Sequence, residues 1–472
     1  MDQRKRKKWI LLLPMIGMLA IMAISCDKGG NTYVSSTPGK KTNGLAWLDQ
    51  NPIPEPNYAT FPEGYTLESG EVTNEAFHEV SWNYFLWLTE EVTLPSGEKA
   101  LRFDSMYNDQ AIVPTISNPT SHVLGGVRQA GLNSILVDEN RRAVYTTMMI
   151  NDIYRDFAIK HKLYTPEGLR SIDSDSNFTD GSLSMKASWM IIPEGKKAPQ
   201  VAYTKRATLY KVVDVNGELT TSDDLPESDS RHNSTVEETV ALVGFHIAAV
   251  VKDHPEFIWA TFEHKDNAPN LILKNETEPS LLAGDVVSDS SYTFYKAGTK
   301  VGLCNIANLG ALEVDPNTQL ISGFYGVDPT TQVYRRYQFG GGSENNQDNI
   351  DSLNQIVRAK LAKENSIWQN YYEVGAVWFD LDKGKLEPDW SLTVIDSIQT
   401  GSTTLSNATI ETFTQNPGQQ NSCFSCHNTT RYNPPHGEPI PAKNVLTSHI
   451  LLKNYNDSVD TKEIIRMIKR SQ

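Results

Sequence analysis

Cysteine is scarce in this chain, and its scarcity excludes one class of fold. Four cysteines in 472 residues cannot form the dense disulfide framework that holds small secreted domains together. Long apolar runs are equally few, because the sequence contains one, from Trp9 to Ile24. A run of about 16 residues is short for a membrane-spanning helix. A protein with several membrane spans is therefore excluded.

An excess of basic residues is also missing. The formal net charge is −14, and removing residues 1–25 takes away five basic residues and Asp2, which brings it to −18. An acidic surface argues against nucleic acid or anionic lipid as a partner. No Gly-rich dinucleotide fingerprint and no internal repeat is found in the sequence.

The N-terminus has the order of an export signal. Arg4 to Lys8 are basic, the apolar run follows, and Ala23-Ile24-Ser25-Cys26 resembles a lipobox. We predict a lipoprotein signal peptide over residues 1–25, with Cys26 diacylated as the mature N-terminus. A retained signal anchor is the alternative. Residues 26–50 are rich in small and polar residues and predict a flexible tether. Either way we expect the chain to be tethered to a bacterial membrane and to face the periplasm or the cell surface.

Period-two alternation of apolar and polar residues predicts strands through the middle of the chain. Met185, Ala187 and Trp189 alternate with polar neighbours, and Asn216-Gly217 is a strong hairpin signal. We expect strands at 184–191, 201–213, 240–251, 256–263, 375–379 and 392–395. Helical spacing predicts helices at 74–88, 152–164 and 349–368.

These elements together predict an α+β fold. Residues 51–397 would form a mainly antiparallel, sandwich-like β-rich body with packed helices. Residues 398–472 would form a small helical region at the C-terminus, and this region holds the most informative motif of the chain.

That motif is Cys423-Phe424-Ser425-Cys426-His427, the attachment pattern of a covalent c-type haem. Two thiols three positions apart can each add to one vinyl group of the same porphyrin. The histidine that follows is then held beneath the ring, where its imidazole reaches the iron as proximal ligand. The motif predicts one haem c bound through Cys423, Cys426 and His427.

Two other interpretations of the cysteine pair stay open. A disulfide or thioredoxin-like redox pair normally opens a helix after a strand, but residues 416–421 before the motif are a polar loop. A zinc site would need His436 and His449 as further ligands, and their separation is longer than the usual spacing. The remaining cysteine, Cys304, is expected to be a small buried hydrophobic residue.

The chain resembles a family of uncharacterised exported bacterial cytochrome c proteins. The resemblance covers most of the mature chain and implies a single-haem exported protein with a large non-haem body. It implies no substrate. The resembling stretches are Trp82–Leu88, Gly181–Trp189, Leu242–Ile247, Phe257–His264, Asp266–Pro269 and Leu405–Phe413.

The position of the motif raises the question of the second axial ligand. Only 45 residues follow His427, which is too few to enclose a haem alone. We therefore expect the β-rich body to cover the other side of the haem. The distal ligand is unassigned, and each candidate also has an ordinary packing, hydrogen-bonding or solvent-exposed role. The main candidates are His449, Met467 and His264, and the less favoured candidates are His436 and His246.

Three functions remain open from the sequence. The first is a membrane-anchored monohaem c-type cytochrome that transfers single electrons outside the cytoplasm to a redox partner, for which the acidic surface favours a basic protein. The second is a haem-dependent oxidoreductase with a substrate site in the body and Glu263, His264 and Asp266 as acid/base candidates. The third is a ligand-binding or sensing lipoprotein. A body far larger than electron transfer needs keeps the last two open.

Overall fold

The computed structural model describes residues 43–63, 65, 74–94, 96–116, 120, 122–130, 134–272, 280–308, 312–381, 385–415, 422–435, 437–453, 455 and 456. Residues from Thr42 onward pack as one compact unit. Cys26, His436 and Met467 lie outside the described residues, as do the signal peptide and most of the predicted tether.

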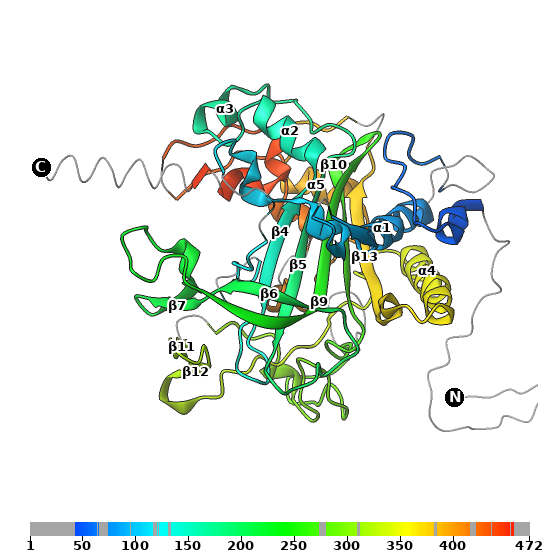
Figure 1. Ribbon diagram of the computed structural model, residues 1–472. Coiled ribbons are helices and arrows are strands. Elements are labelled where there is room, and N and C mark those ends of the chain that lie inside the picture. The colour runs from blue at the N-terminus through cyan, green and yellow to red at the C-terminus, as the bar shows by residue number, and fades with distance from the viewer. Residues whose placement is uncertain are drawn as a thin grey trace, which may run out of the picture. The chain divides into compact units, whose positions relative to one another are not determined.

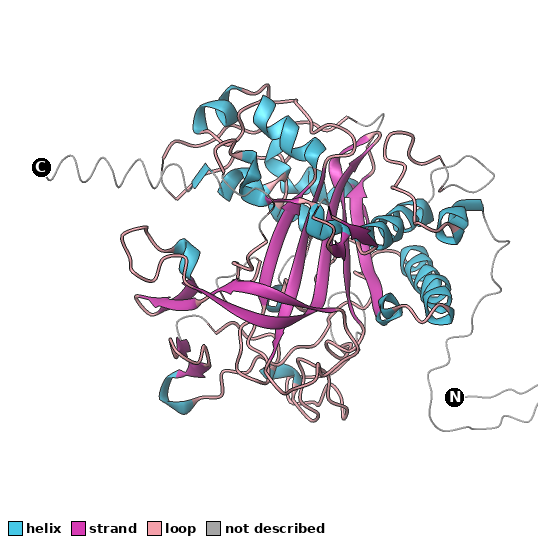
Figure 2. Ribbon diagram, viewed as in Figure 1, coloured by secondary structure: helices cyan, strands magenta, loops and turns pink. Residues whose placement is uncertain are grey.

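One large antiparallel sheet forms the centre of the described chain (Figures 1 and 2). Its strands run in the order β14-β13-β10-β9-β5-β4-β3, and β6 pairs with the far end of β9. The bounds are β3 Tyr107–Asn108, β4 Tyr145–Ile150, β5 Leu183–Ile192, β6 Thr204–Tyr210, β9 Thr235–Val251, β10 His254–His264, β13 Tyr371–Phe379 and β14 Gln399–Gly401. The predicted α+β class with a mainly antiparallel sheet is confirmed.

Helices and small hairpins surround this sheet. The helices are α1 Asn74–Leu88, α2 Asp152–Lys160, α3 Pro166–Ser171, α4 Glu344–Lys363, α5 Leu392–Ile398 and α6 Cys423–Cys426. The hairpins are β1 Glu91–Thr93 with β2 Lys99–Leu101, β7 Val212–Val215 with β8 Glu218–Thr221, and β11 Leu312–Val314 with β12 Ile321–Gly323. Asn216 and Gly217 join β7 to β8 with positive φ angles of 57° and 87°, as their turn signal predicts.

One face of the sheet is closed by α1 and α4. Phe85 of α1 stacks on Phe262 of β10 at 4.4 Å between ring centroids, and Trp82 meets the same ring edge-on at 4.9 Å. All three side chains are buried. The alternating residues of β5, β9 and β10 that point this way are apolar, and they form the main hydrophobic core.

The opposite face is covered by α2 and by segments from the C-terminal part of the chain. Tyr154 of α2 meets the Ser448 hydroxyl at 2.6 Å, and Trp259 of β10 packs beside the segment that contains His427. The loop around Asn407 lies directly on the sheet, where its Nδ2 donates to Thr261 Oγ1 at 3.0 Å. The C-terminal part is therefore built onto the body.

Gly244 of β9 makes this close approach possible. A Cβ at this position would lie 2.3 Å from Thr409 Oγ1 and 2.6 Å from Ser188 Oγ. Those two hydroxyls are themselves hydrogen-bonded at 2.7 Å. Only glycine leaves room for the 405–414 segment to lie flat on the strand.

Two sequence predictions are corrected at the element level. Residues 392–395, predicted as a strand, form α5, because the Ser391 side chain accepts a hydrogen bond from Val394 N and caps a helix there. The helix predicted at 349–368 is α4, which begins earlier because Ser343 caps it through Asn346 N. Cys304 is buried as predicted, with Sγ 3.4 Å from Lys300 O.

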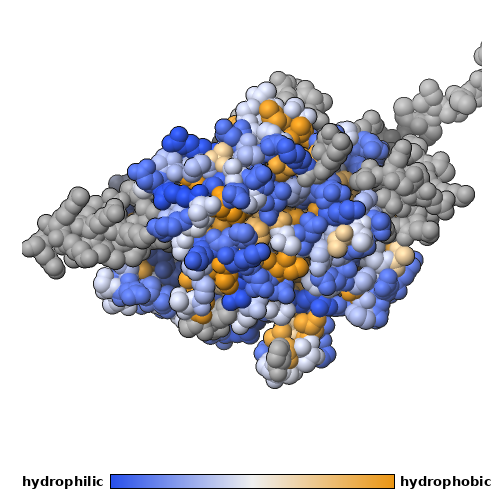
Figure 3. Space-filling view, turned by 90° about the horizontal axis from the view of Figure 1, so that it is seen from above, coloured by the Kyte–Doolittle hydropathy of each residue, from blue (hydrophilic) through white to orange (hydrophobic). Residues whose placement is uncertain are grey.

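The face of the molecule seen from above is mainly hydrophilic. Figure 3 shows polar residues over most of the visible face, with apolar residues in smaller groups between them. No described helix is long and apolar enough to cross a membrane.

Candidate functional site

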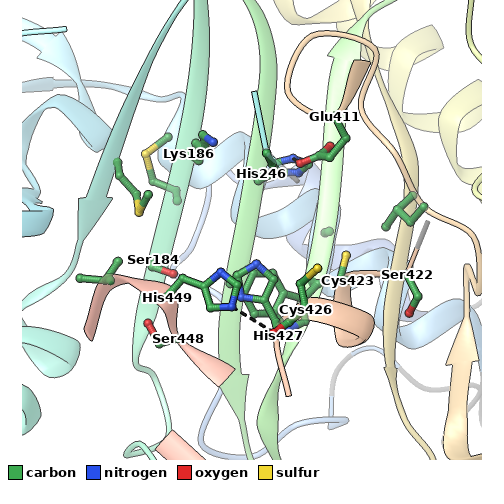
Figure 4. Close-up of a pocket in the computed structure, with 18 of the residues that line it drawn as sticks. Ser184, Lys186, His246, Glu411, Ser422, Cys423, Cys426, His427, Ser448 and His449 are labelled. Atoms are coloured by element: carbon green, nitrogen blue, oxygen red, sulfur yellow. Dashed lines mark hydrogen bonds and ion pairs between the residues drawn. The ribbon is translucent and has the colours of Figure 1, made fainter. Parts of the chain in front are cut away.

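A cavity of about 430 Å³ lies between the second face of the sheet and the C-terminal segments. This is within the size range of small-molecule and cofactor pockets. Figure 4 shows the two groups of side chains that line it. From the strands come Met148, Met185, Ser184, Lys186, His246, Ala248, Trp259 and Ala260. From the C-terminal part come Leu405, Glu411, Ser422, Cys423, Cys426, His427, Ser448, His449 and Ile450.

The predicted haem motif lies on this cavity. Cys423 to Cys426 form a single helical turn, closed by a hydrogen bond from His427 N to Cys423 O at 2.8 Å. Residues three apart in a helix share one side, so both thiols line the cavity. Phe424 points into the protein, where its ring lies 3.8 Å from that of Phe379. This fully buried ring anchors the turn and fixes which way the thiols face.

The His427 imidazole is held in one tautomer. Its Nδ1 lies 2.9 Å from Thr447 O, and a carbonyl oxygen can only accept, so Nδ1 carries the proton and donates. The lone pair is then on Nε2, for which the described residues supply no hydrogen-bond partner. A backbone carbonyl on one ring nitrogen is the usual way in which proteins orient a metal-binding histidine.

Both faces of the same imidazole are covered. Trp259 lies 4.1 Å away between ring centroids at an interplanar angle of 36°, and His449 lies 3.8 Å away at 25°. The Trp259 ring is tilted against the imidazole and the His449 ring is stacked on it, and together they enclose His427. With its Nδ1 edge also bound, the ring has little freedom to turn.

Burial sets the protonation of these groups. It lowers the pKa of His427 well below the ordinary value, and the neighbouring His449 lowers it further. Burial also lowers the pKa of His449, against the opposing effect of its hydrogen bond to Cys426 O. Both imidazoles are therefore neutral near pH 7, which is the form that binds a metal. Burial raises the pKa of the Cys423 thiol above its usual range, so it is not a thiolate.

The other end of the cavity is polar. His246 Nε2 donates to Glu411 Oε1 at 2.8 Å, and the second carboxylate oxygen accepts from Asn407 N at 2.8 Å. Burial raises the pKa of Glu411, but the neighbouring His246, the hydrogen bond from Asn407 and the charge of Lys186 together outweigh burial and bring that pKa below its ordinary value. Lys186 of β5 is the direct cross-strand neighbour of His246 on β9.

These features fit the haem that the motif predicts. The porphyrin would be held by the Cys423 and Cys426 sulfurs and by His427 Nε2, all of which border one cavity. A haem iron needs only this one nitrogen below the ring, because the porphyrin supplies four more. Across the described residues, no three His, Cys, Asp or Glu side chains gather as a metal site, and His436, a ligand of the alternative zinc site, lies outside those residues.

The candidates for the distal haem ligand lie in different parts of the structure. His449 lines the cavity, and its Nε2 donates to Cys426 O at 3.0 Å. His264 does not line the cavity, since its Nε2 donates to Val201 O at 2.8 Å and its Nδ1 accepts from Asp266 N at 3.2 Å. His246 lines the polar end in its pair with Glu411.

The acid/base group proposed from the sequence is not brought to the cavity. Glu263 is fully buried and accepts from Arg335 Nε at 2.6 Å and from Asn267 Nδ2 at 3.3 Å. Asp266 lies 4.0 Å from His264 Nδ1 and is half exposed. Glu263 thus forms a buried ion pair with Arg335, away from the cavity.

Several cavity residues were missed by the sequence reasoning. Met148 and Lys186 are cross-strand partners on β4 and β5, so they share one face of the sheet. The sequence alternation placed Lys186 on the face opposite Met185, Ala187 and Trp189 and gave it no function, and Glu411 was noticed only as part of the resembling stretch. The alternation of Lys186 and Ser188 with large apolar residues was a usable signal, but it could not say what covered the polar face.

Comparisons with protein-family models, curated proteins and solved structures found no match. The resemblance to exported cytochrome c proteins therefore stays a prediction based on the stretches quoted above.

Proposed function

We propose that this protein is a membrane-anchored monohaem c-type cytochrome that takes part in one-electron transfer outside the cytoplasm. The observation that carries the proposal is His427, which has a fixed tautomer, two covered faces and a free Nε2 on the cavity that the two thiols border. A bound haem c would supply an iron that exchanges one electron with a redox partner.

The protein's own groups prepare the attachment. Each thiol would add across one vinyl double bond, forming a carbon–sulfur bond while its hydrogen passes to the second vinyl carbon. No oxidant or reductant is consumed. The partly buried Cys423 sulfur keeps its proton until then, because its surroundings raise the pKa of the thiol, and this limits disulfide formation with Cys426. Trp259 and Thr447 hold the imidazole so that little ordering is needed when iron binds.

The first test is covalent attachment. The full chain is produced with the bacterial cytochrome maturation machinery, separated by denaturing electrophoresis and stained for haem. We expect a stained band for the wild type and none for Cys423→Ala with Cys426→Ala. Cys304→Ala is the matched control and should keep the stain, because that thiol is buried in a different cluster. A stain that survives the double substitution would show that the proposal is wrong.

The second test is the reduced absorption spectrum with and without carbon monoxide. We expect a low-spin spectrum that carbon monoxide leaves unchanged, because a six-coordinate iron suits electron transfer. Candidate sixth ligands on the cavity are His246 and Met148, whereas His449 stacks on the His427 ring and so lies on the same side as the proximal ligand. A high-spin form that binds carbon monoxide would contradict the carrier and favour a haem-dependent oxidoreductase, in which the His246–Glu411 pair could move protons.

A further inference from the structure

Lys186 is a cationic side chain for which the described residues provide no counter-ion. Its side chain lines the cavity, yet among the described residues it has no hydrogen bond and no ion pair. Burial lowers the pKa of Lys186, and the negative charge of Glu411 only partly opposes this. A cation taken from water into a mostly apolar site is costly unless an anion accompanies it.

Glu411 forms no ion pair with Lys186 among the described residues, although it is the nearest described carboxylate that acts on it. One of its oxygens accepts from His246 Nε2 and the other from Asn407 N, both at 2.8 Å. His246, the cross-strand neighbour of Lys186 on β9, is one of the two residues that hold this carboxylate. This end of the cavity thus has one lysine and one carboxylate, and the carboxylate is hydrogen-bonded to His246 and Asn407 and not to Lys186.

The position of Lys186 relative to the thiols is also informative. Figure 4 shows Lys186, His246 and Glu411 at one end of the cavity and Cys423, Cys426 and His427 at the other. Trp259, which stacks on His427, is on β10, two strands away from β5, a separation of about 10 Å at ordinary strand spacing. A porphyrin attached through its vinyl groups carries its two propionates on the opposite side of the ring.

We propose that Lys186 is the binding residue for a carboxylate at this end of the cavity, and that in the mature protein the carboxylate is a propionate of the haem. The inference rests on the proposed function. The same chemistry would also accept a small free carboxylate, so the experiment must separate the two sources.

The test uses porphyrin binding without covalent attachment. The full chain carrying Cys423→Ala and Cys426→Ala is titrated with ferric protoporphyrin IX and with its dimethyl ester, which lacks the carboxylates. Adding Lys186→Met should weaken binding of the diacid by about ten- to hundredfold, the usual range for a charge-assisted hydrogen bond, and should leave the ester unaffected. Lys186→Arg should retain the preference for the diacid.

The control is Lys252→Met, at an exposed position just beyond the end of β9, which should change neither affinity. Equal weakening of the diacid and the ester by Lys186→Met would indicate a packing role and overturn the inference, as would no change in either. The covalent wild-type protein is also titrated with acetate. A spectral response that depends on Lys186 would place a free carboxylate there and overturn the haem propionate as occupant.

The two proposals fail in different ways. Absence of covalent haem in the wild-type chain would overturn the proposed function and this inference together. Covalent haem in the wild type, with no selective effect of Lys186→Met, would overturn this inference alone.

Discussion

The same strands form both faces of the central sheet, but one face packs in the hydrophobic core and the other borders the cavity. Toward α1 and α4 the sheet presents Phe245 and Phe262, which meet helix aromatics in a closed core. Toward the C-terminal segments the same strands present Lys186, His246 and Trp259 around a cavity. Successive residues of a strand point to opposite sides, so one sheet can stabilise the fold with one face and hold a site with the other.

This contrast explains why the cavity stays open. The apolar face is filled by large rings at ordinary aromatic contact distances, 4.4 Å for Phe85 with Phe262. On the other face Gly244 and Ser188 are small, and the 405–414 segment lies on them through hydrogen bonds. Side chains of the sheet and of the C-terminal part pack together beside the cavity, where Ala248 and Val250 belong to one buried cluster with Leu446 and Ile450.

The largest effect should come from the closed face. Phe262→Ala removes a fully buried ring that contacts Phe85 and Trp82. We expect the free energy of unfolding, measured by chemical denaturation, to fall by about 3–5 kcal/mol. Haem content per folded molecule should stay at the wild-type level. Phe262→Leu should lose less, because it keeps part of the volume. A normal stability for Phe262→Ala would contradict the assignment of this face as the main core.

A smaller effect on stability, with a larger effect on the site, is expected for Gly244→Ala. The added Cβ would clash with Thr409 Oγ1 and Ser188 Oγ and lift the 405–414 segment. We expect a loss of about 1–3 kcal/mol in unfolding free energy together with reduced haem staining. Gly284→Ala is the matched control, since a Cβ there meets nothing within 4 Å. Full haem incorporation in Gly244→Ala would contradict the prediction that close packing of the 405–414 segment on Gly244 is needed to form the cavity.

The smallest effect concerns pH. The pKa of Glu411 in the folded protein lies below its ordinary value, so its contribution to stability is present above about pH 4.5 and is lost as the pH falls through the folded pKa. Glu411→Gln should therefore lower the unfolding free energy by about 1 kcal/mol near pH 6 and leave it unchanged at the acid end.

Thermal denaturation across the acid range measures this difference. The exposed Glu227→Gln serves as the control and should follow the wild type at every pH. A constant offset between Glu411→Gln and the wild type at all pH values would contradict a role for the carboxylate charge.

Local patterns predicted the elements of the sheet well where one face is strongly apolar. The alternation from 184 to 191 corresponds to β5, and the helical spacing from 74 to 88 corresponds to α1. Predictions were wrong where a single side chain decided the outcome. The short apolar stretch at 392–395 is compatible with either a strand or a helix, and the N-cap at Ser391 favours the helix α5.

By itself the sequence determined the alternation of the strands, the hairpin at Asn216-Gly217 and the spacing of Cys423, Cys426 and His427. These are local properties, set by neighbours within a few positions. Only the tertiary structure decided that Trp259 and Thr447 hold His427, and that Lys186 lies on the same cavity as residues more than 200 positions away. Such contacts depend on which segment of the chain covers each face of a strand. The periodicity of the strand separates its two faces, but it does not indicate which segment packs on each of them.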